Sequence, residues 1–255
     1  MVRPVFQVSQ IPFAHDCVNL IIGRNGIGKT TLLDTLAGEI DENGNDTQSV
    51  RPNTAYITQN HGLFESLTVS EQIDIIRQID GISGPEAAGN SPDVLNKLIQ
   101  ILEPHRKTRM GMLSGGQAQI VSVWSACMLN RELYLFDEPL SGVDPYNASL
   151  IADSITSLLP RVGSDVQQQR LQEKMQRTVV VTLHSMEQIF LFGDPWLIIL
   201  SDEGMHGAGS VEQGNMAEQA GFSIPRIRAG KASSFLKREN VHQSSDIFRN
   251  LVGQE

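Results

Sequence analysis

A glycine-rich loop is the first part of the chain where residue types and spacing could do chemistry. Gly23, Gly26 and Gly28 permit backbone conformations in which successive N–H groups point at phosphate oxygens. Lys29 can reach the β- and γ-phosphates of a nucleotide, and the Thr30 hydroxyl can ligate Mg2+. The residues predicted to bind the nucleotide are Gly23, Arg24, Asn25, Gly26, Ile27, Gly28, Lys29, Thr30 and Thr31.

The flanks of this loop have the pattern that a phosphate site requires. Residues 18–22 are an apolar run that predicts a buried strand, and residues 30–37 predict a helix that ends at Gly38. The start of that helix adds a partial positive charge that attracts anions. A glycine-rich turn that binds nothing is the alternative, and the full eight-residue pattern between strand and helix disfavours it.

A pair of carboxylates follows a second apolar run, at residues 133–136. A carboxylate at the end of a buried strand costs several kcal/mol unless a cation or hydrogen bonds satisfy it. We therefore expect Asp137 to serve the Mg2+ that Thr30 implies. Glu138 is placed to orient and deprotonate a water that attacks a γ-phosphate. The alternative is an exposed acidic turn before Pro139, for which an apolar run would be a poor lead-in.

The composition limits the class of protein. The chain has 255 residues, 40% hydrophobic and 19% charged, which indicates a soluble intracellular domain. Its longest apolar runs have the length of strands and fall short of the roughly 20 residues that cross a bilayer. A net charge of −9 argues against a nucleic-acid partner. Cys17 and Cys127 are interpreted as buried thiols in a reducing cytosol rather than a disulfide.

The elements that must position these residues alternate along the chain as strands and helices. This alternation predicts an α/β fold with a mainly parallel sheet. The polar, turn-rich segment after Gly38 predicts a reduced antiparallel β flap, about residues 39–58, whose last strand delivers Gln59.

An all-helical insert follows Gln59. Thr68 and Glu71 predict a capping box for a helix that carries apolar residues at helical spacing, Ile73, Ile76 and Ile79. A second helix begins at Pro92 and has an apolar face of Val94, Leu95, Leu98, Ile99 and Leu102.

The predicted organisation has three parts. Residues 1–60 and 113–213 form a nucleotide-binding core, and residues 61–112 form the helical subdomain. Residues 214–255 form a C-terminal appendage, in which residues 223–234 are interpreted as a linker. The apolar residues expected to pack in the appendage are Phe235, Leu236, Ile247 and Phe248.

The segment at residues 113–117 reads Leu-Ser-Gly-Gly-Gln, and Ser114 can cap a helix that runs to about Leu129. Together with the glycine-rich loop before it and Asp137–Glu138 after it, this segment resembles the signature of the ATP-binding cassette (ABC) ATPases. The resemblance covers residues 5–212, where six motifs occur in the family's order. It implies a P-loop NTPase core that is RecA-like, binds ATP through residues 23–31 and carries an inserted helical subdomain.

The resemblance also implies roles for residues that would say little alone. Gln59 resembles the Q-loop glutamine, which touches the Mg2+ and the attacking water. His184, after an apolar strand, resembles the switch histidine that hydrogen-bonds the γ-phosphate. Asp144, in the segment of residues 141–144, resembles the D-loop aspartate at a dimer interface. The implied catalytic residues are Glu138, His184 and Gln59, and the implied Mg2+ ligands are Thr30, Gln59 and Asp137, the last through water.

In this family two ATP-binding domains close head to tail. The resemblance therefore implies that Ser114, Gly115, Gly116 and Gln117 of one chain complete the ATP site of a second, with a homodimer as the simpler arrangement.

Three functions follow as hypotheses. The favoured one is the ATPase subunit of an ABC transporter, on the cytoplasmic face of a membrane with separate transmembrane subunits. The others are a cytosolic non-transport ABC ATPase and a regulatory module with little turnover, and the presence of Lys29, Glu138 and His184 argues against the latter.

Three features depart from the family's pattern. The aromatic residue that usually stacks on adenine has only Phe6 and Phe13 as candidates, each of which is equally a core residue. Ile120 stands where the family usually has an arginine. The segment of residues 166–177 is longer than is typical and predicts a solvated helix or loop.

Overall fold

The computed structural model describes residues 6–47, 51–59, 64–79, 92–159, 177–201 and 226–239. The chain forms two compact units, and each is considered by itself. Unit 1 comprises Met1–Ala14, Asn19–Pro52 and Val180–Glu255, and unit 2 comprises His15–Val18 and Asn53–Val179. The predicted division into a core and a helical subdomain at residues 61–112 stays a prediction.

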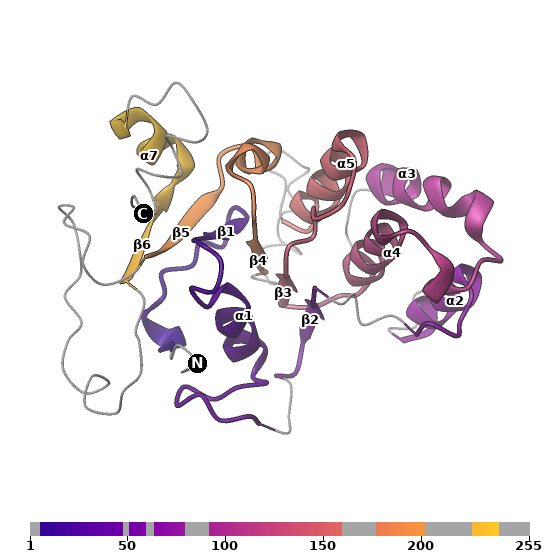
Figure 1. Cartoon of the computed structure of the whole chain (residues 1–255), viewed down its shortest axis with the longest axis horizontal. Helices are drawn as coiled ribbons and strands as arrows, with labels where there is room; N and C mark the ends of the chain where they lie inside the picture. The colour runs from indigo at the N-terminus through magenta and orange to yellow at the C-terminus, as the bar shows by residue number, and fades with distance from the viewer. Residues whose placement is uncertain are drawn as a thin grey trace, which may run out of the picture. The chain divides into compact units, whose positions relative to one another are not determined.

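Unit 1 is built on a mixed sheet in which β1 (Asn19–Ile22) lies between two parallel neighbours (Figure 1). These neighbours are β5 (Trp196–Ser201) and β4 (Thr178–Thr182), of which the last three residues belong to this unit. All four residues of β1 are buried, as expected of a strand covered on both faces. The helix α1 (Lys29–Ala37) follows β1 and ends at Gly38, whose φ of 84° is the left-handed conformation predicted for a helix end. Unit 1 also contains two 3₁₀ helices, η1 (Val8–Gln10) and η4 (Met186–Phe192).

The C-terminal segment corrects the predicted linker at residues 223–234. The strand β6 (Arg226–Lys231) pairs antiparallel with all six residues of β5, and α7 (Ala232–Glu239) packs on it. Phe235 of α7 is buried, as predicted, and the Arg228 guanidinium lies 5.6 Å from the centre of its ring. Ile247 and Phe248 lie outside the described residues. A polar strand of this kind is specified by its pairing partner rather than by its own residues.

The predicted β flap is smaller than a hairpin of strands. Within residues 39–47, antiparallel pairing is limited to a bridge between Ile40 and Asp46. Asp41 organises the turn between them, because its Oδ1 accepts from the backbone N–H groups of Asn43 and Asn45 at 2.9 and 2.8 Å. The strand expected at the end of this region is present as β2 (Thr54–Ile57), which belongs to unit 2.

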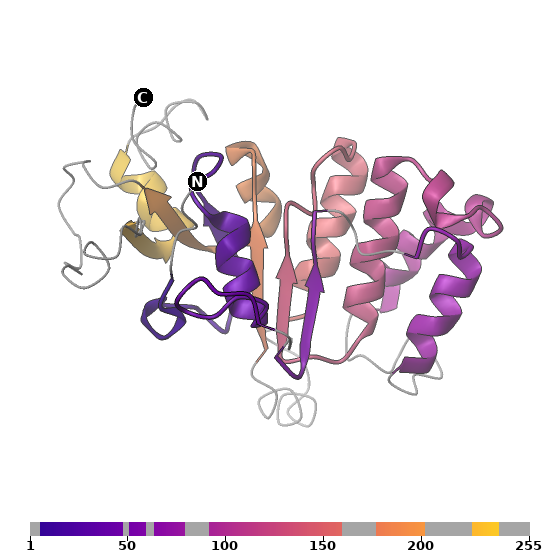
Figure 2. The same ribbon diagram turned by 60° about the horizontal axis from the view of Figure 1, so that its bottom comes forward.

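In its described residues, unit 2 holds two complete parallel strands, the start of β4 and a group of helices. The strand β2 pairs with β3 (Leu133–Phe136) from Thr54 opposite Leu133 to Ile57 opposite Phe136, and the two run side by side (Figure 2). The helix α4 (Gly115–Met128) packs against β2 and three other helices (Figure 1). Those helices are α2 (Val69–Ile79), α3 (Pro92–Leu102) and α5 (Pro145–Thr156), and the 3₁₀ helices η2 (Glu103–His105) and η3 (Met110–Met112) lie between α3 and α4 in sequence.

Local sequence signals predict the ends of these helices well. Thr68 and Glu71 form the expected capping box, in which the Thr68 N–H donates to Glu71 Oε2 at 2.8 Å. The predicted apolar faces bury Ile73 and Ile76 on α2, while Ile79, the last residue of that helix, is exposed. On α3 the buried residues are Leu95, Leu98 and Leu102.

The core of unit 2 accommodates Ile120, which stands where the family usually has an arginine. It is fully buried on α4, where every residue from Gln119 to Met128 is buried.

Cys17 and Cys127, both within the described residues, form no disulfide, as predicted. Cys127 is buried and Cys17 half-buried. Of the longer segment predicted at residues 166–177, only Arg177 is described, and its guanidinium donates to the Leu158 carbonyl and the Asn130 side chain at 3.0 Å each.

Candidate active site

The glycine-rich loop connects β1 to α1 in unit 1, and two of its glycines are required for different reasons. Gly23 is buried, and a Cβ there would come within 2.9 Å of both the Leu200 carbonyl oxygen and the Ile27 side chain. Gly28, the residue that precedes α1, has a φ of 107°, which side chains rarely adopt. The loop is therefore held close to β5 at one end and turned sharply at the other.

Lys29 is bonded to the loop that it follows. Its side chain is only 7% exposed, and its Nζ donates to the carbonyl oxygens of Gly23 at 2.9 Å and Arg24 at 3.4 Å. A buried ammonium group needs such acceptors. These contacts hold the positive charge against the loop backbone, and Gly28 offers no side-chain oxygen to the N–H groups that begin α1. The positive charge of Lys29 and the free N–H groups at the start of α1 together favour the binding of an anion at this loop.

A Gly23→Ala substitution should test the close approach of the loop to β5. We expect a loss of about 1–3 kcal/mol in the free energy of unfolding, because the added methyl group overpacks a rigid backbone contact. Chemical denaturation would measure it. Gly115→Ala is the matched control, because a Cβ at Gly115 meets no atom within 4 Å. A loss no larger for Gly23→Ala than for this control would contradict the close approach.

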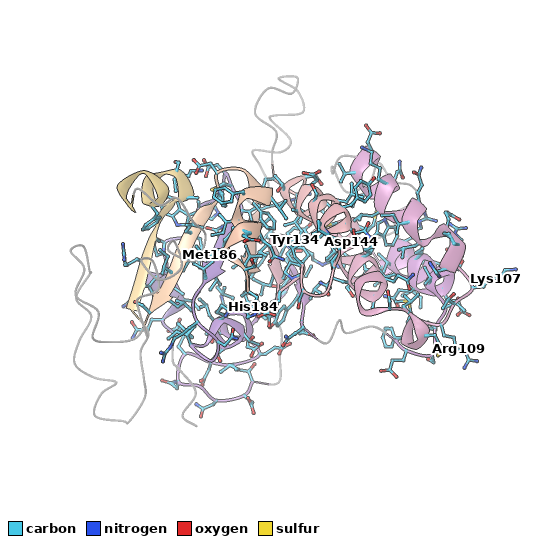
Figure 3. All side chains as sticks on the ribbon, turned by 45° about the horizontal axis from the view of Figure 1, so that its top comes forward. Lys107, Arg109, Tyr134, Asp144, His184 and Met186 are labelled. Carbon is cyan, nitrogen blue, oxygen red and sulfur yellow. The ribbon has the colours of Figure 1, made fainter. Side chains whose placement is uncertain are left out.

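His184 follows β4 in unit 1 after one intervening residue, Leu183, and its side chain is exposed. The backbone of the preceding residue is fixed, because the Leu183 N–H donates to the Ile21 carbonyl of β1 at 3.2 Å. Figure 3 labels His184 at the end of this strand. Because β1 and β4 are parallel neighbours, His184 and the glycine-rich loop both lie beyond the carboxyl ends of these strands.

In unit 2 the structure brings Gln59 and Glu138 together. They follow the parallel neighbours β2 and β3, and the Asp137 N–H continues the ladder by donating to the Ile57 carbonyl at 2.9 Å. Gln59 Nε2 donates to Glu138 Oε2 at 3.4 Å, the long end of the range for a hydrogen bond. Asp137 is 3% exposed, so the two adjacent carboxylates have different surroundings: one is buried and the other half-buried.

Glu138 has a strained backbone, with a φ of 50°. A residue with a long side chain rarely adopts positive φ, and the cost is on the order of 1–3 kcal/mol. Such strain persists where the surroundings impose it, and it is found preferentially at functional sites. Sequence reasoning predicted a carboxylate at this position and did not predict its conformation.

The Ser-Gly-Gly segment begins α4 with a complete capping box. Ser114 Oγ accepts from the Gln117 N–H at 3.3 Å, and Gln117 Oε1 accepts from the Ser114 N–H at 3.0 Å. Ser114 and Gly115 are exposed, while Gly116 is half-buried. A helix start with its first residues open to solvent can accept an anion from another molecule.

Residues 141–144, which resemble a D-loop, lie directly against this segment. A Cβ at Gly116 would come within 3.3 Å of the Gly142 carbonyl oxygen, so the two backbones approach closely. Asp144 begins α5, where its Oδ1 accepts from the N–H groups of Asn147 at 3.1 Å and Tyr146 at 3.2 Å (Figure 3). The backbone hydrogen bond from Asn147 is the main reason why the pKa of Asp144 lies below its usual range. The Asp144 carboxylate is therefore engaged in capping α5.

The two aromatic candidates for adenine stacking differ in burial. Phe6 is buried in the core of unit 1, which agrees with the alternative that it is a core residue. Phe13 is half-buried and stays a candidate.

No helix among the described residues is both long and apolar enough to cross a membrane.

The loop, the strand-end carboxylates and the capped Ser-Gly-Gly segment define a nucleotide-binding domain of the P-loop class. Residues 10–141, just over half of the chain, match the family described as ABC transporter. The chain therefore belongs to the ABC transporter family, and it is an ABC ATPase domain.

Individual relatives agree with this assignment. The chain is 28% identical over 199 residues to the phospholipid-transporting ATPase ABCA3 of Mus musculus, which covers 73% of this chain and 11% of that protein. It thus spans about a tenth of the length of such curated relatives.

Solved structures share the fold. An ATP-binding subunit of an ABC transporter matches with a TM-score of 0.58 and 20% identity over 92% of this chain and 88% of that chain. An archaeal ribosome recycling factor, in complex with a ribosomal stalk protein, matches with a TM-score of 0.58 and 23% identity over 89% and 37%. A dimeric ATP-binding cassette with ADP and Pi, in a post-hydrolysis state, matches with a TM-score of 0.51 and 20% identity over 78% and 91%. These likenesses confirm the predicted α/β P-loop fold.

Proposed function

We propose that this chain is the ATP-hydrolysing subunit of an ABC transporter, and that ATP-driven closure and opening of a dimer powers substrate movement. One observation carries the proposal: the chain has two separate features that could each form half of a composite ATP site. One half is the loop whose carbonyls hold Lys29, and the other is the exposed, capped start of α4 at Ser114 and Gly115.

In the proposed mechanism the phosphate loop and Lys29 bind the phosphates, and Glu138 takes the proton of the attacking water. The Gln59 amide, which reaches the Glu138 carboxylate, holds that carboxylate and orients the water. His184 hydrogen-bonds the γ-phosphate. Loss of that phosphate removes the contacts that hold the dimer closed, so hydrolysis shifts the equilibrium towards the open state.

Mg2+ is the cofactor that we propose beside ATP. Thr30, Gln59 and Asp137 offer hydroxyl, amide and carboxylate oxygens, the kind of ligand that Mg2+ prefers. The burial of Asp137 fits this role, because a buried carboxylate favours a nearby cation. Thr30 and Gln59 would hold the ion directly and Asp137 through water. When bound, Mg2+ neutralises charge on the β- and γ-phosphates.

The partner that completes each ATP site is a second ABC ATPase domain, and a homodimer is the simplest form. Dimers are known for a solved ATP-binding cassette of the same fold. Each chain would then supply a phosphate loop to one site and Ser114, Gly115, Gly116 and Gln117 to the other. In a two-fold dimer of this kind both sites are equivalent.

An exposed apolar pair on unit 2 supports a separate membrane partner. Phe64 and Met112 are 63% and 78% exposed. Each lies next in sequence to a residue of one backbone contact, in which the Gly111 N–H donates to the Glu65 carbonyl at 3.2 Å. Large apolar side chains grouped on a surface favour a protein contact. We propose that transmembrane subunits bind here, which would hold the chain on the cytoplasmic face of a membrane.

The double substitution Phe64→Ser and Met112→Ser should test this contact. Removal of two apolar side chains that the proposed interface would bury should weaken recovery of the chain with solubilised membrane subunits roughly hundredfold or more. ATP hydrolysis by the isolated chain should stay near wild type. Phe190→Ser is the matched control, because Phe190 is 56% exposed on η4 of unit 1. Equal recovery of the double variant and the control would contradict the contact, and a partner found only in the soluble fraction would favour the non-transport ATPase.

A further inference from the structure

His105, which belongs to none of the family's motifs, contacts the signature segment. It ends the short helix η2, is half-buried, and has its Nε2 atom 2.8 Å from Gln117 Nε2. Gln117 is the residue whose side chain completes the capping box at Ser114. One side chain therefore links His105 to the exposed serine.

The hydrogen-bond chemistry fixes the direction of this contact. The Ser114 backbone N–H can only donate, so the Gln117 oxygen, and not its nitrogen, must face it at 3.0 Å. Gln117 Nε2 is then the atom that faces His105, and it can only donate. His105 Nε2 must accept, which requires a neutral ring with its proton on Nδ1.

We propose that His105 is a positioning residue for the signature segment. By accepting from Gln117 it keeps the amide oxygen on the Ser114 N–H, and so holds Ser114 and the start of α4 in the geometry that meets ATP on a second copy of the chain. The proposal rests on the proposed function, because Ser114 meets that ATP only when the dimer closes. Without the acceptor at residue 105, the amide nitrogen loses its partner and Gln117 can turn away from Ser114.

The position of His105 does not depend on its ring. Its carbonyl accepts from the Thr108 N–H at 2.8 Å, and the Arg106 N–H donates to the Glu103 carbonyl at 3.4 Å. The nearest charged side chains on this turn, Glu103 and Arg106, pair with each other at 3.2 Å. Lys107, further along the turn, points outward from it (Figure 3). A substitution at residue 105 should therefore leave the turn folded.

Two variants of similar length separate the hydrogen bond from packing. His105→Gln places a carbonyl oxygen within reach of Gln117 Nε2, whereas His105→Met offers no comparable acceptor. Each is made together with Glu138→Gln, and the dimer dissociation constant with saturating ATP is measured by analytical ultracentrifugation. His105→Met should raise this constant about tenfold to hundredfold, since both sites of a homodimer lose a hydrogen bond. His105→Gln should restore it to within about threefold of the parent.

The outcomes are distinguishable. If the Glu138→Gln parent itself does not dimerise with ATP, the proposed function fails, and the role of His105 in it falls too. If the parent dimerises and His105→Met matches it, or His105→Gln is weakened as much as His105→Met, His105 is not a positioning residue. ATP binding to a single chain should be unchanged in every variant. Imidazole nitrogen chemical shifts give an independent reading: a proton on Nε2 of His105 in the wild type would overturn the contact itself.

Discussion

Glu138→Gln should slow ATP hydrolysis by at least about a hundredfold, because the amide cannot take the proton of the attacking water. The substitution keeps the shape of the side chain, so the strained backbone at φ 50° and the buried end of β3 should be unaffected. Gln59 Nε2 can donate to the new amide oxygen as it does to Glu138 Oε2. A steady-state phosphate-release assay measures the loss, and nucleotide titration should show unchanged ATP binding.

The same variant should accumulate an ATP-dependent dimer, because the closed state forms but its γ-phosphate contacts are not removed. Size-exclusion chromatography with light scattering would detect it. Glu132→Gln is the matched control: it changes an exposed glutamate that precedes the same strand, at the opposite end of β3 from Glu138. Glu132→Gln should turn over ATP like the wild type. A monomeric Glu138→Gln chain under saturating ATP, or equal losses in the two variants, would contradict the assignment of Glu138.

Features that depend on nearby residues could be predicted from the sequence. The left-handed end of α1 at Gly38, the capping box at Thr68 and the helix cap at Ser114 each depend on a few consecutive residues. The strands before the glycine-rich loop and before Asp137 are continuous apolar runs, which is how buried parallel strands appear in a sequence. The order of these features was enough to identify the ABC ATPase class.

Features that depend on distant residues could not be predicted. Gly23 lacks room for a side chain because Leu200, on another strand of unit 1, lies against it. The segment interpreted as a linker is β6 because β5 offers it a pairing edge. The polar residues of β6 give no strand signal of their own, and strand formation depends on such pairing.

The candidate site divides in the same way. The residue types of the candidate site could be predicted from the sequence, because only a few kinds of side chain can bind a phosphate, hold a metal ion or accept a proton. The φ of Glu138, the approach of Gly116 to the Gly142 carbonyl and the contact of His105 with Gln117 were not. These three features are tertiary: they depend on how the strand end, the D-loop and η2 pack around the motifs. They are also where this chain can differ from others with the same motifs.

Ser114→Arg should abolish most ATP hydrolysis while a single chain still binds ATP. The substitution removes a hydroxyl from the exposed start of α4 and places a long side chain where a second chain's γ-phosphate would lie. Loss of a comparable transition-state donor lowers turnover about 10²- to 10³-fold. ATP binding by one chain uses the phosphate loop of unit 1, which this substitution does not touch. Thr156→Arg, at the opposite end of α5 from the D-loop, is the control for an added arginine on unit 2.

Mixing two inactive chains makes the test specific for a site shared between chains. Lys29→Met breaks the phosphate loop and leaves the signature intact, whereas Ser114→Arg does the reverse. A dimer of one chain of each kind has one site in which both halves are intact, so an equimolar mixture should recover about a quarter of wild-type turnover. If phosphate loop and signature acted within one chain, every site in the mixture would stay broken. Absence of recovery, or normal turnover by Ser114→Arg alone, would therefore contradict an ATP site divided between two chains.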